Sequence, residues 1–159
     1  MATRNDLADN AKKTSIGVLQ GCLTDGVDLY NATRQAHWNV KGPSFGSLHL
    51  LFEGFYTTLA EDIDLLAERI VQLGGTANGT SQTVAQGTRL APYPTALKDG
   101  MGHVKELADR YATVAKALRE GIDATDEAGD ADTADILTGV SKNTDKALWM
   151  LEAHLQGDR

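Results

Sequence analysis

The sequence predicts an all-α protein, folded as a four-helix bundle with a long crossover between helices 2 and 3. Four segments repeat apolar residues at spacings of three or four, which is the period of an amphipathic helix. Aromatic residues make up only 6% of the 159 residues, and Ala, Leu, Asp and Glu are frequent. A chain of this length is long enough for one domain with a single sizeable core, so we assign 1–159 to one domain.

The first predicted helix runs from about residue 14 to residue 40. It ends at Gly42-Pro43, because proline disfavours helical geometry in the residue before it. Residues 1–13 are polar with both charge signs, so we expect a flexible N-terminal tail or a first helical turn there. The apolar stripe of this helix continues to His37 and consists of Ile16, Leu19, Leu23, Val27 and Tyr30.

The second predicted helix begins after Ser44 or Ser47, either of which can cap it. Gly74-Gly75 ends it, because glycine adopts the left-handed conformation without a Cβ penalty. At ~27 residues this helix is about 40 Å long. Its apolar stripe consists of Leu48, Phe52, Phe55, Leu59, Ile63, Leu66, Ile70 and Leu73.

Residues 76–98 interrupt the periodicity with two glycines and two prolines, and a short helix is expected at Ser81–Gln86. So long a connection in a compact domain indicates a crossover that returns along the bundle and makes helices 2 and 3 parallel. A third helix follows from Met101 to Leu118, then an acidic turn over 123–135, then a fourth helix.

Composition narrows the class of function. The formal charge of −7 argues against a general nucleic-acid-binding surface and favours attraction of cations. No run of apolar residues is long enough for a membrane span, and no secretory signal is visible. The single cysteine, Cys22, fits a reducing cytoplasm and falls in an apolar helical pattern, where we expect a buried, inert thiol.

Two histidines and three carboxylates in the central stretch form a candidate metal site. Such a donor set suits Fe(II), Mn(II) or Zn(II). His49 and Glu53 share one helix face, as do Asp64 and Glu68, since each pair is four residues apart. His37, just before the turn, lies near the first pair.

These residues cannot all bind one ion within one helix. Eleven residues separate Glu53 from Asp64, which is close to three whole turns, so both pairs face nearly the same way but lie about 16 Å apart along the axis. Another helix of the same chain or a second copy could complete each half, and the arrangement with a second copy uses all five residues. We therefore favour a second copy packed antiparallel about a two-fold axis near residue 58.

The same stretch carries a resemblance to a known family. The segments HWNVKGPSF-GS-LH-LLFE and DLLAERIVQLGG (64–75) resemble the signature of the Dps family, the ferritin-like miniferritins named as DNA-binding proteins from starved cells. The resemblance covers the motif densely and the helix layout along most of the chain. It implies a ferritin-like fold, a hollow dodecamer, and iron oxidation at each two-fold interface.

The resemblance also implies residue roles. It implies a di-iron centre, open to other divalent metals, that oxidises Fe(II) preferentially with hydrogen peroxide and delivers ferric mineral to the cavity, which protects the cell from oxidative stress. His37, His49 and Glu53 would come from one subunit, and Asp64 and Glu68 from its partner, with Glu68 as a candidate bridge between two irons.

Two positions carry alternatives. Trp38 matches a tryptophan of the family that is thought to limit radical escape. A role in packing near the interface explains this residue equally well. Glu53 stands where the family usually has Asp, which moves the oxygen donor by about one methylene and puts the second iron position in question.

The resemblance extends to the acidic turn, and it raises the question of DNA. Acids in this turn resemble those that line three-fold pores in the family, although a solvated acidic loop explains each one equally well. Because the basic residues of 1–13 are few and mixed with acids, we expect weak or absent DNA binding. The rival functions are a nucleoid-compacting protein and a ferritin-like bundle that binds zinc. The candidate pore residues are Asp123, Asp126, Glu127, Asp130 and Asp132.

Overall fold

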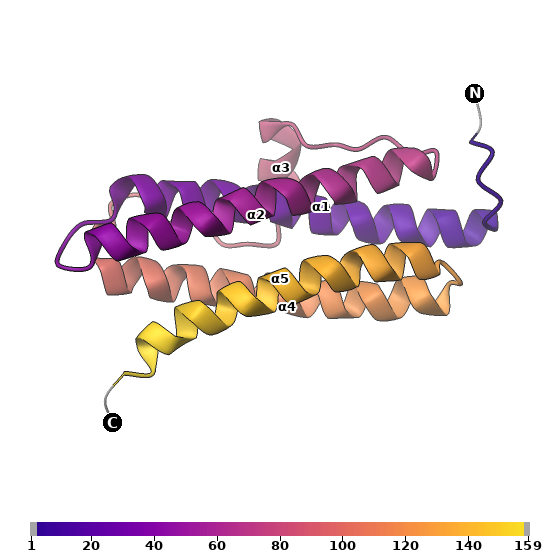
Figure 1. Ribbon diagram of the computed structural model, residues 1–159. Helices are drawn as coiled ribbons and strands as arrows, with labels where there is room; N and C mark the ends of the chain where they lie inside the picture. Colours follow the sequence, from indigo (N-terminus) through magenta and orange to yellow (C-terminus); the bar gives the residue numbers. More distant parts are fainter. Residues whose placement is uncertain (1–2, 158–159) are drawn as a thin grey trace.

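The computed structural model describes residues 3–157, which form five helices and no strand. The four long helices build two antiparallel pairs, α1 with α2 and α4 with α5, which pack on each other through α1–α4 and α2–α5 contacts (Figure 1). This confirms the predicted all-α four-helix bundle with a short helix in the crossover. The helices are α1 (Asp9–Asn39), α2 (Phe45–Gln72), α3 (Ser81–Gly87), α4 (Gly100–Glu127) and α5 (Ala131–Leu155).

The boundaries of α1 and α2 agree with the sequence prediction except at the N-terminal end of each helix. α1 begins at Asp9 rather than near residue 14, so part of the expected tail is helical. Ser44 lies at the N-cap of α2, but its side chain makes no capping hydrogen bond. The far end of α2 is as predicted: Gly74 has φ +91°, and the Gly75 amide donates to the Ile70 carbonyl at 2.9 Å.

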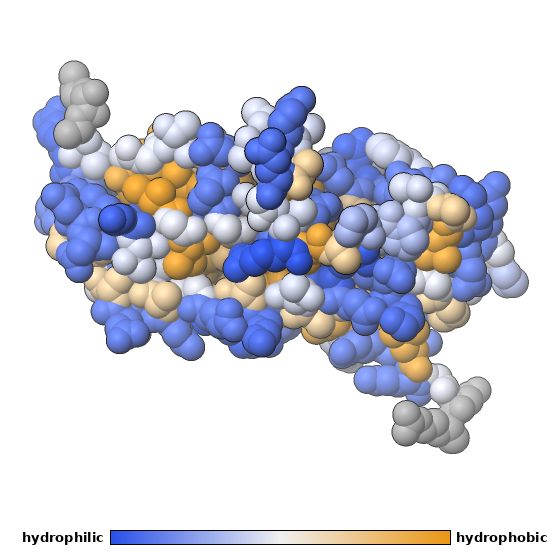
Figure 2. Space-filling view, turned by 180° about the vertical axis from the view of Figure 1, so that it is seen from behind, coloured by the Kyte–Doolittle hydropathy of each residue, from blue (hydrophilic) through white to orange (hydrophobic). Residues whose placement is uncertain are grey.

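The crossover returns from the end of α2 to the level of the α1–α2 turn, where the Lys41 amide donates to the Lys98 carbonyl. α2 and α4 therefore run parallel, as predicted (Figure 1). The backbone amide and the guanidinium of Arg89 both donate to the buried carboxylate of Asp25 on α1. Figure 2 shows a face that carries mainly hydrophilic residues, with apolar ones between them.

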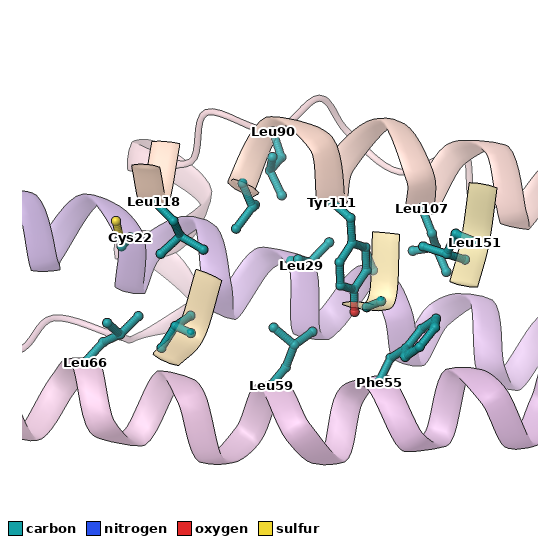
Figure 3. Packing of buried hydrophobic residues seen from close by; sticks show 14 of the residues in the cluster. Cys22, Leu29, Phe55, Leu59, Leu66, Leu90, Leu107, Tyr111, Leu118 and Leu151 are labelled. Atoms are coloured by element: carbon teal, nitrogen blue, oxygen red, sulfur yellow. The ribbon is translucent and has the colours of Figure 1, made fainter. Parts of the chain in front are cut away.

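All four long helices and Leu90 of the crossover contribute to one apolar core (Figure 3). Cys22 is part of this core, as expected, and burial raises the pKa of its thiol to about 11. A thiol with so high a pKa carries almost no thiolate at neutral pH and is a poor nucleophile. No helix within residues 3–157 is long and apolar enough to cross a membrane.

The predicted acidic turn is shorter than expected. α4 continues to Glu127 and α5 begins at Ala131, so most of the acids of 123–135 are on helices. Asp130 is fully buried at the N-cap of α5, where Thr133 donates to it through its backbone amide (3.0 Å) and its hydroxyl (2.6 Å). Arg69 donates to the same carboxylate at 2.9 Å. Asp130 therefore does not line a solvent path, and the pore hypothesis is wrong for this residue.

Candidate metal centre

His37 and His49 come together although they belong to different helices. His37 is on the last turns of α1 and His49 on the first turns of α2, and Gly42, with φ +109°, reverses the chain between them. The two imidazole rings stack with centroids 3.7 Å apart and planes within 17°. His37 is buried and His49 half-buried.

The backbone around the two rings determines which nitrogen is free. His37 Nδ1 lies 2.8 Å from the His49 carbonyl oxygen, and His49 Nδ1 lies 2.8 Å from the His37 carbonyl oxygen. A carbonyl oxygen can only accept, so each Nδ1 carries a proton and donates it. In the neutral form of each ring, Nε2 then keeps its lone pair for a metal ion, and the hydrogen bond from Nδ1 holds the ring in orientation.

Aromatic side chains that the sequence analysis did not select surround the histidine pair. Tyr56 meets the His37 ring edge-on, with centroids 5.1 Å apart and an interplanar angle of 82°. Phe45 lies on the other side, 5.2 Å from the His49 ring. The spacing of four residues between Phe45 and His49 on one helix was a signal for this contact.

Trp38 lies beside the histidine pair but points outward, with 60% of its surface exposed. The guanidinium carbon of Arg34 lies 4.6 Å above the indole ring and 5.3 Å from the ring of Tyr30. Because Tyr30, Arg34 and Trp38 follow each other at intervals of four residues, the stack runs along one face of α1. The same guanidinium lies 6.0 Å from the ring of Tyr56, which contacts His37, so a cation stands behind the aromatic side of the histidine pair, and the sequence had not indicated it.

The three carboxylates lie on α2 and are exposed: Glu53 one turn after His49, Asp64 and Glu68 towards the far end. Within residues 3–157 of one chain, no group of three or more His, Cys, Asp or Glu side chains gathers so that it could hold a metal ion. One chain thus presents a histidine pair with one acid at one end of α2 and two acids at the other.

A shallow hollow of about 450 Å³ adjoins Glu68 of the second acidic pair. It lies where the C-terminal end of α2 meets the loop that follows, and Glu68 is on its wall. The rest of the lining is mostly apolar or uncharged and comes from Ala67, Val71, Gln72 and Ala77.

A different acid of α2 faces the bundle. Asp62 is only 4% exposed and accepts a hydrogen bond from Asn143 of α5 at 3.0 Å. Burial raises the pKa of Asp62 to about 6, although the hydrogen bond from Asn143 acts in the opposite direction. Asp62 also lines a groove of about 320 Å³ between α2 and α5. Sequence spacing did not single it out, because the signal would have been a lone acid on an apolar face.

Comparison with known proteins relates this chain to ferritin-like proteins. A family model of the ferritin-like domain matches residues 16–159. The DNA protection during starvation protein of Agrobacterium fabrum is 50% identical over 154 residues, which cover 97% of this chain and 95% of that protein.

Solved structures agree with the sequence relatives. The Dps protein of Vibrio cholerae O1, described as a member of a broad superfamily of ferritin-like diiron-carboxylate proteins, has a TM-score of 0.91 at 29% identity, covering 98% of each chain. DpsC from Streptomyces coelicolor has a TM-score of 0.95 at 26% identity, covering 100% of this chain and 93% of that one.

Proposed function

The chain belongs to the Dps family of ferritin-like proteins, and from this premise we propose that it is a cytoplasmic ferroxidase that stores iron. In this proposal Fe(II) is the substrate, hydrogen peroxide the preferred oxidant, and a ferric mineral inside a hollow dodecamer the product. The removal of Fe(II) and peroxide together protects the cell from oxidative stress.

The observation that carries the proposal is the reciprocal pair of hydrogen bonds between His37 and His49. Each Nδ1–H is already bound to a carbonyl, so both Nε2 lone pairs are free without a change of tautomer. Such preorganised nitrogen donors suit Fe(II), and the carboxylates of α2 add the oxygen donors that Fe(III) favours after oxidation.

The missing donors come, in this proposal, from a second chain. His37, His49 and Glu53 of one copy meet Asp64 and Glu68 of another across a two-fold axis, twice per dimer. The arrangement uses all five candidate residues, which a single chain cannot do because about 16 Å of helix separates Glu53 from Asp64. In this arrangement Glu68 would be the bridging ligand, and the side chain of Glu53 would move its oxygen donor to the second iron by about one methylene.

The reaction requires positioning rather than a nucleophilic side chain. Each of two Fe(II) ions gives up one electron, and one hydrogen peroxide accepts both as its O–O bond breaks. Together with two waters this yields two FeO(OH) units and releases four protons. The exposed acids of α4 and α5 (Asp123, Asp126, Glu127 and Asp132) attract the incoming cations.

Anaerobic addition of Fe(II) followed by peroxide tests the proposal, with ferric absorbance as the readout. We expect the double variant His37→Ala/His49→Ala to lose the fast phase that the wild type shows. His154→Ala is the matched control, because His154 is an exposed histidine on α5 and we expect it to leave the rate unchanged. Equal rates in the wild type and the double variant would contradict the proposed centre.

Nucleoid compaction is the alternative function, and we propose that DNA binding is weak or absent at physiological salt. The N-terminal segment supports this view: the Thr3 hydroxyl donates to the Gln72 carbonyl at the end of α2, and the Lys12 ammonium donates to the Asn5 carbonyl. These residues are held against the bundle, and an acidic surface repels phosphate. A DNA mobility shift that persists at physiological salt would reverse this assignment.

A further inference from the structure

We propose that Phe45 of each chain seats in the hollow beside Glu68 of a second copy and so fixes the register of the shared metal sites. The inference deepens the proposed function, on whose two-fold arrangement it rests. It assigns the affinity between the two chains to an apolar contact rather than to the metal ligands.

Phe45 is an aromatic side chain without a full partner in its own chain. It is the first residue of α2 and 47% exposed, with its ring 5.2 Å from that of His49. Phe45 is one of four exposed large apolar side chains on α2, together with Leu50, Leu65 and Val71. Several such residues on one helix indicate a surface that another molecule covers.

The hollow at the opposite end of α2 has the complementary character. Ala67, Val71 and Ala77 line it, and it is shallow and open to solvent, so an aromatic side chain of another molecule can reach these residues. Val71 is itself 59% exposed on that surface. A ring seated there would cover the exposed part of Val71 and lie next to Glu68.

One register brings the two features together. Phe45 lies one helical turn before His49, and Gln72, on the wall of the hollow, lies one turn after Glu68. An antiparallel pairing that sets His49 opposite Glu68 therefore also sets Phe45 opposite Gln72. Near the axis the exposed residues Thr57 and Ala60 are small, so the two helices can approach each other there.

Charge explains why an apolar contact is needed. In the same register Glu53 faces Asp64 of the other chain, and Glu68 is nearby. Without a cation these carboxylates repel one another across the axis. The two symmetry-related Phe45 contacts offset this repulsion and hold the pair together before any iron arrives.

A cross-link tests the contact directly. Gly46→Cys and Val71→Cys, which face each other in this register and leave Phe45 in place, lie at opposite ends of α2 in one chain, about 38 Å apart, so they cannot form a disulfide within one chain. Under mild oxidation we expect covalent dimers. The control combines Gly46→Cys with Leu65→Cys, an exposed position that this register leaves far from Gly46. No dimer, or equal dimer in the control, would overturn the proposal. The native Cys22 is buried and does not interfere.

Association of the metal-free protein gives a second measure. We expect Phe45→Ala to weaken the dimer roughly a hundredfold, about tenfold for each of two symmetric contacts. Phe45→Leu, which keeps apolar volume, should recover most of it, and Trp149→Ala, on the exposed face of α5, should have no effect on this step. Unchanged dimerisation of Phe45→Ala at low concentration would refute the contact.

The two proposals fail separately. His37→Ala/His49→Ala should cross-link as well as the parent cysteine pair while it oxidises no iron. A protein that cross-links but does not oxidise Fe(II) would retain the Phe45 contact and lose the proposed function. Fast peroxide-dependent oxidation of Fe(II) without cross-linking would retain the proposed function and overturn the Phe45 contact.

Discussion

Replacing Asp130 by alanine tests whether this acid supports the fold rather than a pore. The carboxylate is 0% exposed and pairs with Arg69, which is 5% exposed. Removing it leaves the guanidinium buried without its anion and α5 without its capping acceptor. Breaking a buried pair by deleting one partner costs about 3–5 kcal/mol, which includes most of the lost cap. For a chain of this length the melting temperature should fall by roughly 10 °C or more.

The matched control is Asp132→Ala, two residues further along α5, where the acid is exposed. We expect its melting temperature to stay within about 2 °C of the wild type, since surface changes cost little. Thermal unfolding of all three proteins at one concentration keeps the contribution of assembly comparable. Equal melting temperatures for Asp130→Ala and Asp132→Ala would refute the structural role.

The pH dependence of the Asp130 variant has a definite sign. Burial alone would raise the pKa of Asp130, but the hydrogen bonds from Thr133 and Arg69 outweigh it and hold the pKa below its usual value. A group with a lowered pKa stabilises the native state above its unfolded pKa and loses that contribution as the pH falls through its folded value. The gap between wild type and Asp130→Ala should therefore narrow on acidification below about pH 4.

Three further changes give measurable outcomes. Asp62→Asn should stabilise the protein by up to ~3 kcal/mol at pH 7 and by nothing below about pH 4. The reason is that a pKa raised to about 6 makes ionisation of Asp62 in the folded state unfavourable between about pH 4 and pH 6. Curves of stability against pH that run parallel for the two proteins would contradict this. Glu53→Asp should tighten the binding of the second Fe(II) at each site, measured by anaerobic titration. Identical binding isotherms for the variant and the wild type would show that the extra methylene of Glu53 has no effect. Trp38→Phe should leave the initial oxidation rate unchanged but increase protein oxidation under excess peroxide, measured by mass spectrometry; unchanged damage would favour the packing role.

Periodicity and turn chemistry were enough to predict the helices and their order. The breaks at Gly42-Pro43 and Gly74-Gly75 are local, because they depend on backbone conformations that few other residues adopt, and the structure has its turns there. The parallel course of α2 and α4 also followed from the sequence, since a long crossover between successive helices lets them run in the same direction. The motif in the central stretch was specific enough to indicate the family.

The side-chain contacts around the candidate centre required the tertiary structure, both within one helix and between helices. The ring of Phe45 beside His49 and the cation of Arg34 over Trp38 depend on side-chain directions that spacing suggests but does not select. The reciprocal hydrogen bonds between His37 and His49 depend on how the α1–α2 turn brings two backbones together.

Asp130 shows most clearly the difference between what the sequence predicts and what the fold adds. In the sequence it is one acid among several in an acidic stretch, and composition treats all of them alike. In the fold it is the partner of Arg69, sixty-one residues away, because α2 and α5 pack against each other. The sequence by itself determined the helices, their connections and the donor types of the candidate centre. The tertiary structure decided which carboxylates face solvent and which are buried, because burial depends on packing between segments that are far apart in the chain.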